Sequence, residues 1–111
     1  MYKQGDIVLV DFPFTNRGGS KIRPALVISN VTLNQVNEIF LLPITGTDFN
    51  DGLGFNIYKE GLDYPLAKPS YVRVNNILAL DKHLIIRKIN RLNNVLLEQI
   101  IDSFSELIEI L

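Results

Sequence analysis

Cysteine is absent from the 111-residue sequence, and histidine occurs only once. Without cysteine, the chain has no disulfide framework, no thiol nucleophile and no thiolate metal site. A single histidine excludes a histidine-built metal site and a pair of histidines acting as acid and base within one chain. We therefore expect a protein that works without a bound metal or cofactor.

Long apolar runs are also missing. The N-terminal segment has one short apolar run at residues 7–12, and the Leu- and Ile-rich C-terminal segment carries four acidic residues. A secretory leader needs a longer apolar core, and a transmembrane helix needs roughly 20 apolar residues. We expect a cytoplasmic protein without a membrane segment, and the length fits one domain over residues 1–111.

The net charge is close to zero, with 11 Lys and Arg against 12 Asp and Glu. Nucleic-acid-binding domains are usually basic, so this balance by itself argues against such a partner. The charges are unevenly spread, however: residues 57–91 hold seven basic and three acidic side chains, and residues 92–111 hold four acidic and no basic ones. Since local potential decides whether a polyanion docks, a basic body and an acidic tail remain compatible with nucleic acid.

The apolar pattern is typical of a mainly β protein. Short runs rich in β-branched and apolar residues cover 7–12, 25–29, 38–45, 55–58, 70–80 and 85–92, with polar loops at 13–21 and 46–54. Pro24 is expected at the start of the second strand, and Pro43 indicates an edge or a bulge in the third. Closely spaced short strands with Gly and Pro between them favour a small, strongly curved barrel.

The last residues change to a helical period. From Val95 to Leu111, apolar residues recur at steps of three and four, and acidic or polar residues fill the gaps. Asn93 or Asn94 suits the N-cap position. We expect one amphipathic helix that closes the barrel.

Three features that superficially suggest chemistry do not support it. His83 lies in a polar, turn-like patch and is interpreted as a surface residue. Residues 48–52 resemble a calcium loop, but a glycine occupies the fifth position and no suitable Glu follows. Residues 18–21 contain the residue types of a phosphate-binding loop without its spacing or its following helix.

Arg23 and Thr45 are the stronger candidates. Arg23 follows a glycine-containing loop, and its planar guanidinium has five donors that suit a phosphate. Thr45 ends the third predicted strand just before Gly46, where its hydroxyl can donate to a phosphoryl oxygen. Residue chemistry alone favours a surface ion pair for Arg23 and a turn cap for Thr45 over a catalytic role.

Several motifs, taken in order, cover nearly the whole chain: Gly5-Asp6-Ile7-Val8, Arg23-Pro24-Ala25-Leu26-Val27-Ile28-Ser29, Pro43-Ile44-Thr45, Lys68-Pro69-Ser70-Tyr71-Val72-Arg73 and Leu80-Asp81-Lys82. Together with the C-terminal helix, this order resembles the MazF/PemK (Kid) family of toxin ribonucleases. The opening Gly-Asp strand followed by Arg-Pro-Ala-Leu-Val is the most specific part.

The resemblance implies a mainly β fold with a C-terminal helix, the SH3-like small barrel of MazF, PemK and CcdB proteins. It also implies a homodimeric, sequence-specific and metal-independent endoribonuclease. Such a toxin cleaves single-stranded mRNA through attack of the 2′-hydroxyl, and a cognate MazE/PemI-like antitoxin inhibits it.

The family's site residues fall on particular positions of this sequence. The resemblance implies catalytic roles for Arg23 and Thr45. Implied contacts to RNA and antitoxin are Asn16, Arg17, Ser20, Lys21, Ser70 and Arg73, and possible base-stacking aromatics are Phe14, Tyr58, Tyr64 and Tyr71. A guanidinium keeps its proton at neutral pH, so the residue that accepts the 2′-hydroxyl proton stays open.

Two other functions fit the same barrel. One is a non-enzymatic CcdB-like poison that binds DNA gyrase, and the other is a catalytically inactive binding member of the fold. The Arg-Pro and Pro-Ile-Thr motifs favour the ribonuclease, because the gyrase poisons act through their C-terminal helix.

Overall fold

The computed structural model describes residues 2–13, 19–57 and 59–111. Its elements, in chain order, are β1 (Asp6–Pro13), β2 (Ser20–Val27), α1 (Val31–Asn34), β3 (Glu38–Thr45), β4 (Gly54–Ile57), β5 (Ser70–Arg73), β6 (Leu78–Asp81), β7 (Ile85–Arg91) and α2 (Asn94–Glu106). Two short 3₁₀ helices, Lys59–Gly61 and Lys82–Leu84, link β4 to β5 and β6 to β7. No described helix has the length and apolar character needed to cross a membrane.

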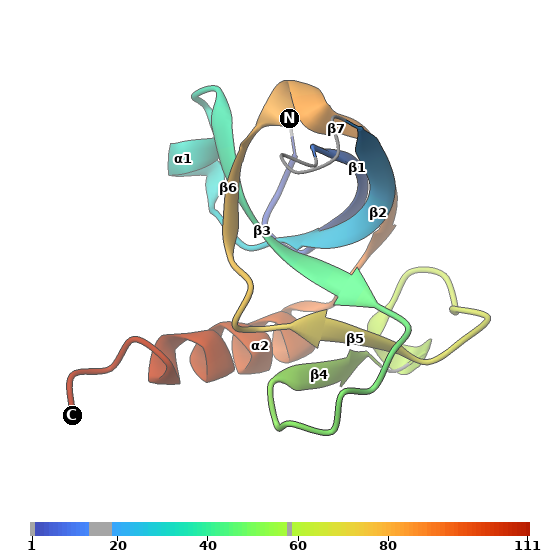
Figure 1. The fold of residues 1–111 in the computed structure, drawn as a ribbon, viewed down its shortest axis with the longest axis vertical. Helices are drawn as coiled ribbons and strands as arrows, with labels where there is room; N and C mark the ends of the chain where they lie inside the picture. Colours follow the sequence, from blue (N-terminus) through green and yellow to red (C-terminus); the bar gives the residue numbers. More distant parts are fainter. Residues whose placement is uncertain (1, 14–18, 58) are drawn as a thin grey trace.

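The strands form one antiparallel sheet that curls into a small barrel. Their order is β4-β5-β3-β2-β1-β7, with β6 also paired to β3, and this order does not close on itself among the described residues. Figure 1 shows β1, β2, β3, β6 and β7 curving around one space, with β4 and β5 extending away beside α2. This arrangement confirms the prediction of a mainly β, SH3-like barrel with a C-terminal helix.

The central strands are apolar because both of their faces are buried. Side chains alternate between the two faces of a strand. In β2, Leu26 packs into one core cluster with Leu97 and Ile100 of α2, whereas its neighbours Ala25 and Val27 pack into a second cluster. The first cluster lies between the sheet and the helix, and the second lies inside the curl of the barrel. Two-sided burial explains why these strands appear in the sequence as continuous apolar runs.

One edge of β3 changes its partner along the strand. Residues Glu38–Leu41 pair with β6, and Ile44 and Thr45 pair with β5. Pro43 lies in the gap between these two pairings, where a missing backbone N–H costs no hydrogen bond on that side. The sequence predicts an edge or a bulge at Pro43. In the structure, Pro43 lies in a central strand, at a point where the neighbouring strand on one side changes from β6 to β5.

The structure corrects several predicted boundaries. The predicted strand 70–80 is two strands, because residues 74–77 leave the sheet in a turn. The second strand begins at Ser20 instead of residue 25, so Pro24 lies within it, at a point where its β3 edge is not yet paired. The C-terminal helix ends at Glu106 instead of Leu111, since acidic residues near a helix C-terminus oppose its dipole.

Helix α2 begins where its cap was expected. The side chain of Asn93 accepts a hydrogen bond from the Leu96 N–H at 2.9 Å, which satisfies one of the free donors of the first turn. The buried side chains of α2 are Leu97 and Ile100, and they complete the core cluster on this face of the sheet.

Gly5 and Asp6 fix the start of strand β1 through hydrogen bonds. The N–H of Gly5 donates to the Val27 carbonyl at 2.8 Å, and its own carbonyl accepts from Leu92 N–H at 2.9 Å. The buried Asp6 carboxylate accepts from Arg91 at 3.1 Å. Gly5 thus ties β1 to the segments that end β2 and follow β7, and it does so with a φ of +95°.

Replacing Gly5 with alanine should destabilise the fold by about 1–3 kcal/mol, because positive φ is strained for any L side chain. In addition, a Cβ on Gly5 would lie 3.2 Å from the Leu92 carbonyl oxygen. Urea denaturation followed by circular dichroism measures the change. Gly46→Ala is the matched control, since its Cβ would meet nothing within 4 Å. Equal midpoints for the two variants would contradict this role of Gly5.

Candidate active site

Four polar side chains, one on each of the strands β4, β5, β3 and β2, lie across the sheet. Asn56 of β4 pairs with Tyr71 of β5, and Tyr71 pairs with Thr45 of β3. The β2–β3 register pairs Ala25 with Pro43, and continuing it by two residues sets Arg23 opposite Thr45. The observed pairing stops at Ala25 and Pro43, so Arg23 and Thr45 each lie two residues beyond it on neighbouring strands. We call Asn56, Tyr71, Thr45 and Arg23 the polar row.

Alternation places the whole polar row on one face of the sheet. Arg23 lies two residues before Ala25, whose side chain faces the barrel interior, and Thr45 lies on the face opposite to Ile44, which packs toward α2. Arg23 and Asn56 are exposed, and Thr45 and Tyr71 are half-buried. The polar row therefore lies on the same face of the sheet as the barrel interior, in a part of that face that solvent reaches.

The hydroxyl of Thr45 is oriented by the backbone that follows it. Thr47 N–H donates to Thr45 Oγ1 at 3.2 Å, which occupies one acceptor position of that oxygen. Since a hydroxyl keeps one proton of its own, Thr45 can still donate to a ligand atom. Arg23 lies beside it with an exposed guanidinium that carries permanent charge. Together they provide a positive charge and a neutral donor for an anionic oxygen.

Arg73 holds the loop between β3 and β4. Its Nη1 and Nη2 donate to the two carboxylate oxygens of Asp51 at 2.9 and 2.8 Å, and its guanidinium carbon lies 4.9 Å from the centre of the Phe49 ring. The hydrogen bonds from Arg73 lower the pKa of Asp51 from 3.8 to about 2. The side chain is only 10% exposed. Arg73 therefore anchors the loop that leaves Thr45, and its contact with RNA stays a prediction.

The other predicted contact residues fall in different places. Lys21 is exposed on β2, two residues before Arg23 and so on the same face. Ser70 lies on the opposite face, in alternation with Tyr71, and its hydroxyl donates to the Lys68 carbonyl at 3.4 Å. Ser20 begins β2 opposite Pro13, and Asn16 and Arg17 lie outside the described residues. The structure brings Lys21, but not Ser70, to the polar row.

Of the four possible stacking aromatics, Tyr71 lies in the polar row. Tyr64 is 66% exposed on the segment before β5, and Phe14 and Tyr58 lie outside the described residues. Asn56 was not singled out from the sequence, although it is the polar residue between apolar Phe55 and Ile57. That alternation marks an outward-facing position, but only the strand pairing shows that it faces the same way as Thr45.

Acidic side chains of α2 lie on the face of the sheet opposite the polar row. The acidic residues of α2, Glu98, Asp102 and Glu106, are exposed on the helix that covers the face opposite the polar row. His83 is exposed, and its Nδ1 lies 2.7 Å from Asp81. Among the residues in the described ranges, no group of three His, Asp or Glu side chains could hold a metal ion. A polyanion thus meets Arg23 and Lys21 on one face and repulsion on the other.

The fold and the polar row define a small SH3-like barrel with a cationic, hydroxyl-bearing open edge. Residues 3–108 match the family model described as the PemK-like, MazF-like toxin of type II toxin–antitoxin systems. The chain belongs to this family. A search of curated proteins found no match to the sequence.

Solved structures share the fold at low sequence identity. The chain is similar to a MazE–MazF complex from Deinococcus radiodurans, with a TM-score of 0.78, 18% identity, and 96% of this chain and 95% of that chain covered. It is also similar to a mycobacterial endoribonuclease in complex with its cognate antitoxin (TM-score 0.77, 17% identity, 97% and 95% covered). A third is the Mycobacterium tuberculosis toxin MazF-mt6 (TM-score 0.70, 16% identity, 91% and 95% covered).

The Arg73–Asp51 pair predicts a pH dependence of stability. Because the folded-state pKa of Asp51 is depressed, its contribution is present above pH 3.8 and is lost as the pH falls toward about 2. Asp51→Asn should therefore be less stable than the parent near neutral pH, and the difference should shrink toward pH 2 and in high salt. Urea denaturation across this pH range measures it.

The matched control is Asp48→Asn, in the same loop. Asp48 accepts a hydrogen bond from Asn50 N–H at 2.9 Å, which an asparagine oxygen can also accept. It should show no such pH-dependent difference. A constant difference for Asp51→Asn at every pH would exclude the ion pair as its cause.

Proposed function

We propose that the protein is a sequence-specific endoribonuclease that cleaves single-stranded mRNA without a metal ion. The observation that carries this proposal is that Arg23 and Thr45 lie on neighbouring strands, each two residues beyond the paired Ala25 and Pro43, and share one face of the sheet that solvent reaches. Membership of a toxin family of type II toxin–antitoxin systems supports it. Unpaired RNA suits an open sheet edge, since its bases can spread onto the protein surface.

The reaction begins with attack of a ribose 2′-oxygen on the adjacent phosphorus. The 2′-hydroxyl gives its proton to a base that is not assigned to a residue, its oxygen forms a bond to phosphorus, the bond from phosphorus to the 5′-oxygen breaks, and the 5′-oxygen gains a proton. The products are a 2′,3′-cyclic phosphate and a free 5′-hydroxyl. Arg23 stabilises the charge that develops on the phosphoryl oxygens, and Thr45 donates a hydrogen bond to one of them. In this proposal Arg23 also donates the proton that the leaving 5′-oxygen gains.

Two protein partners belong to the same proposal. The Deinococcus radiodurans and mycobacterial structures contain antitoxins bound to their own toxins. For this chain, we propose a MazE/PemI-like antitoxin with an acidic segment that covers the cationic edge formed by Lys21 and Arg23. We also propose that the toxin is a homodimer.

Arg23→Ala and Thr45→Ala should each lower the cleavage rate by about 10²- to 10³-fold, because each removes a donor to the developing charge. The measurement is cleavage of a long single-stranded RNA by purified protein in EDTA, with circular dichroism to verify folding. Arg87→Ala, which removes an exposed arginine from β7, is the matched control and should cleave normally.

Two results would contradict this assignment. Robust cleavage by the Arg23→Ala protein would remove Arg23 from the reaction. If the parent protein cleaves no RNA but inhibits DNA gyrase, the CcdB-like function would replace the ribonuclease, and inactivity in both assays would indicate a binding member of the fold.

Sedimentation equilibrium at micromolar concentration should give about twice the 12.6 kDa mass of the chain. The exposed apolar side chains outside the polar row, including Ile86, Leu107 and Ile108, support association of copies. A single monomeric species across the concentration range would contradict the dimer.

A further inference from the structure

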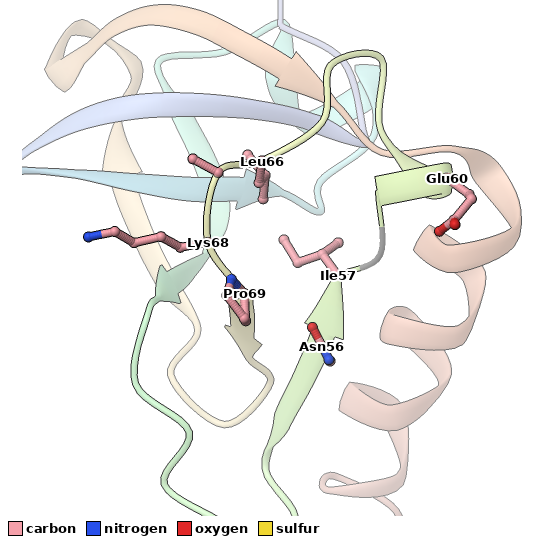
Figure 2. Close-up of a pocket in the computed structure, with 7 residues that line it drawn as sticks. Asn56, Ile57, Glu60, Leu66, Lys68 and Pro69 are labelled. Atoms are coloured by element: carbon pink, nitrogen blue, oxygen red, sulfur yellow. The ribbon is translucent and has the colours of Figure 1, made fainter.

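A surface hollow of about 420 Å³ lies beside the polar row. It is lined by the end of β4 and the segment that leads into β5: Asn56, Ile57, Glu60, Leu66, Ala67, Lys68 and Pro69. Figure 2 shows Ile57, Leu66 and Pro69 around the hollow, Asn56 on the same strand as Ile57, and Lys68 extending outward. The hollow therefore combines an apolar wall, an amide and a cation at its mouth.

The segment that leads to this wall is anchored at residues 61–64 by hydrogen bonds to β7 and to the start of α2. Asn90 of β7 both accepts from Tyr64 N–H at 3.1 Å and donates to the Tyr64 carbonyl at 2.9 Å. Asp63 N–H donates to the Arg91 carbonyl at 3.1 Å, and Asn93 N–H donates to the Gly61 carbonyl at 2.7 Å. These bonds fix where the segment starts toward the wall residues 66–69.

The hollow and the candidate catalytic pair share a strand register. Asn56 pairs with Tyr71, and Tyr71 pairs with Thr45. Since neighbouring strands lie about 4.8 Å apart, Asn56 is roughly 10 Å from Thr45 along the row. An RNA strand that places a phosphate between Arg23 and Thr45 and follows the row therefore reaches the hollow with a nearby nucleotide.

We propose that this hollow binds one unpaired nucleobase of the RNA and that Asn56 reads its edge. The inference rests on the proposed function. The amide of Asn56 is exposed and makes no hydrogen bond to another described residue, so both its donor and its acceptor are available. An amide presents these groups side by side, which matches the donor–acceptor pairs on base edges.

Two more lining residues fit the same ligand. Leu66 and Pro69 offer an apolar surface for the flat face of a base, with the buried Ile57 behind them, and the carboxylate of Glu60 is the lining group that disfavours a phosphate close to it. Lys68 extends away from this wall, where the phosphate attached to the bound nucleotide would lie. Asn56 is therefore a specificity-determining residue, and Lys68 contributes affinity that does not depend on sequence.

The test is to cleave a long single-stranded RNA of known sequence and map every cut end by sequencing. The parent protein should show a base preference at several positions. Asn56→Ala should lose at least about tenfold of that discrimination at one position while keeping it at the others. Asn56→Asp, which can only accept, should shift the preference there toward bases that offer an amino group. Ala67→Trp, which fills the hollow, should weaken cleavage at the preferred sites.

Controls separate this inference from the function on which it rests. Gln35→Ala removes an exposed amide just after α1, far from β4 in Figure 1, and should leave every base preference unchanged. If the parent cleaves RNA and Asn56→Ala retains its full preference at every position, the nucleobase site is wrong and the ribonuclease stands. If the parent cleaves no RNA at all, both proposals are overturned.

Discussion

The shared strand β3 is the constraint on which the site depends. One edge pairs with β2, and the other pairs first with β6 and then with β5. This change of partner joins the curled barrel to the β4–β5 extension, and it occurs just before Thr45. Strand pairing sets Thr45 opposite Tyr71 on one side, and on the other side β2 brings Arg23 to the strand next to it, two residues beyond the last β2–β3 pair. A β3 with one continuous partner would not assemble this row.

The burial of both faces of the sheet decides where a polyanion can bind. Helix α2 covers one face and carries acidic residues on its outer side, and the other face is closed by the barrel except at the polar row. The near-neutral net charge therefore does not describe either face: the acidic outer side of α2 and the cationic Lys21 and Arg23 lie on opposite faces of the sheet. Binding depends on the local potential at Arg23 and Lys21, and not on the total.

Residues within the family-like motifs divide between chemistry and architecture. Gly5 and Asp6 link the entry of β1 to β2 and β7, and Arg73 holds the loop after Thr45 through Asp51 and Phe49. Among the residues that the structure describes, Thr45 Oγ1 accepts one hydrogen bond from Thr47 N–H, and the exposed Arg23 side chain makes no such anchoring bond. A motif match therefore identifies the fold strongly, whereas it does not by itself separate the reacting residues from those that position them.

The sequence by itself determined the strand runs, the N-cap of α2 and the family, because local patterns, turn residues and caps act over a few neighbours. It placed β3 at residues 38–45, as observed, and selected Arg23 and Thr45 as candidates. Only the tertiary structure decided that residues 70–80 split in two, that Asn56 and Tyr71 join the row, and that Ser70 faces away. These features follow from the register between strands distant in sequence, which no local pattern records.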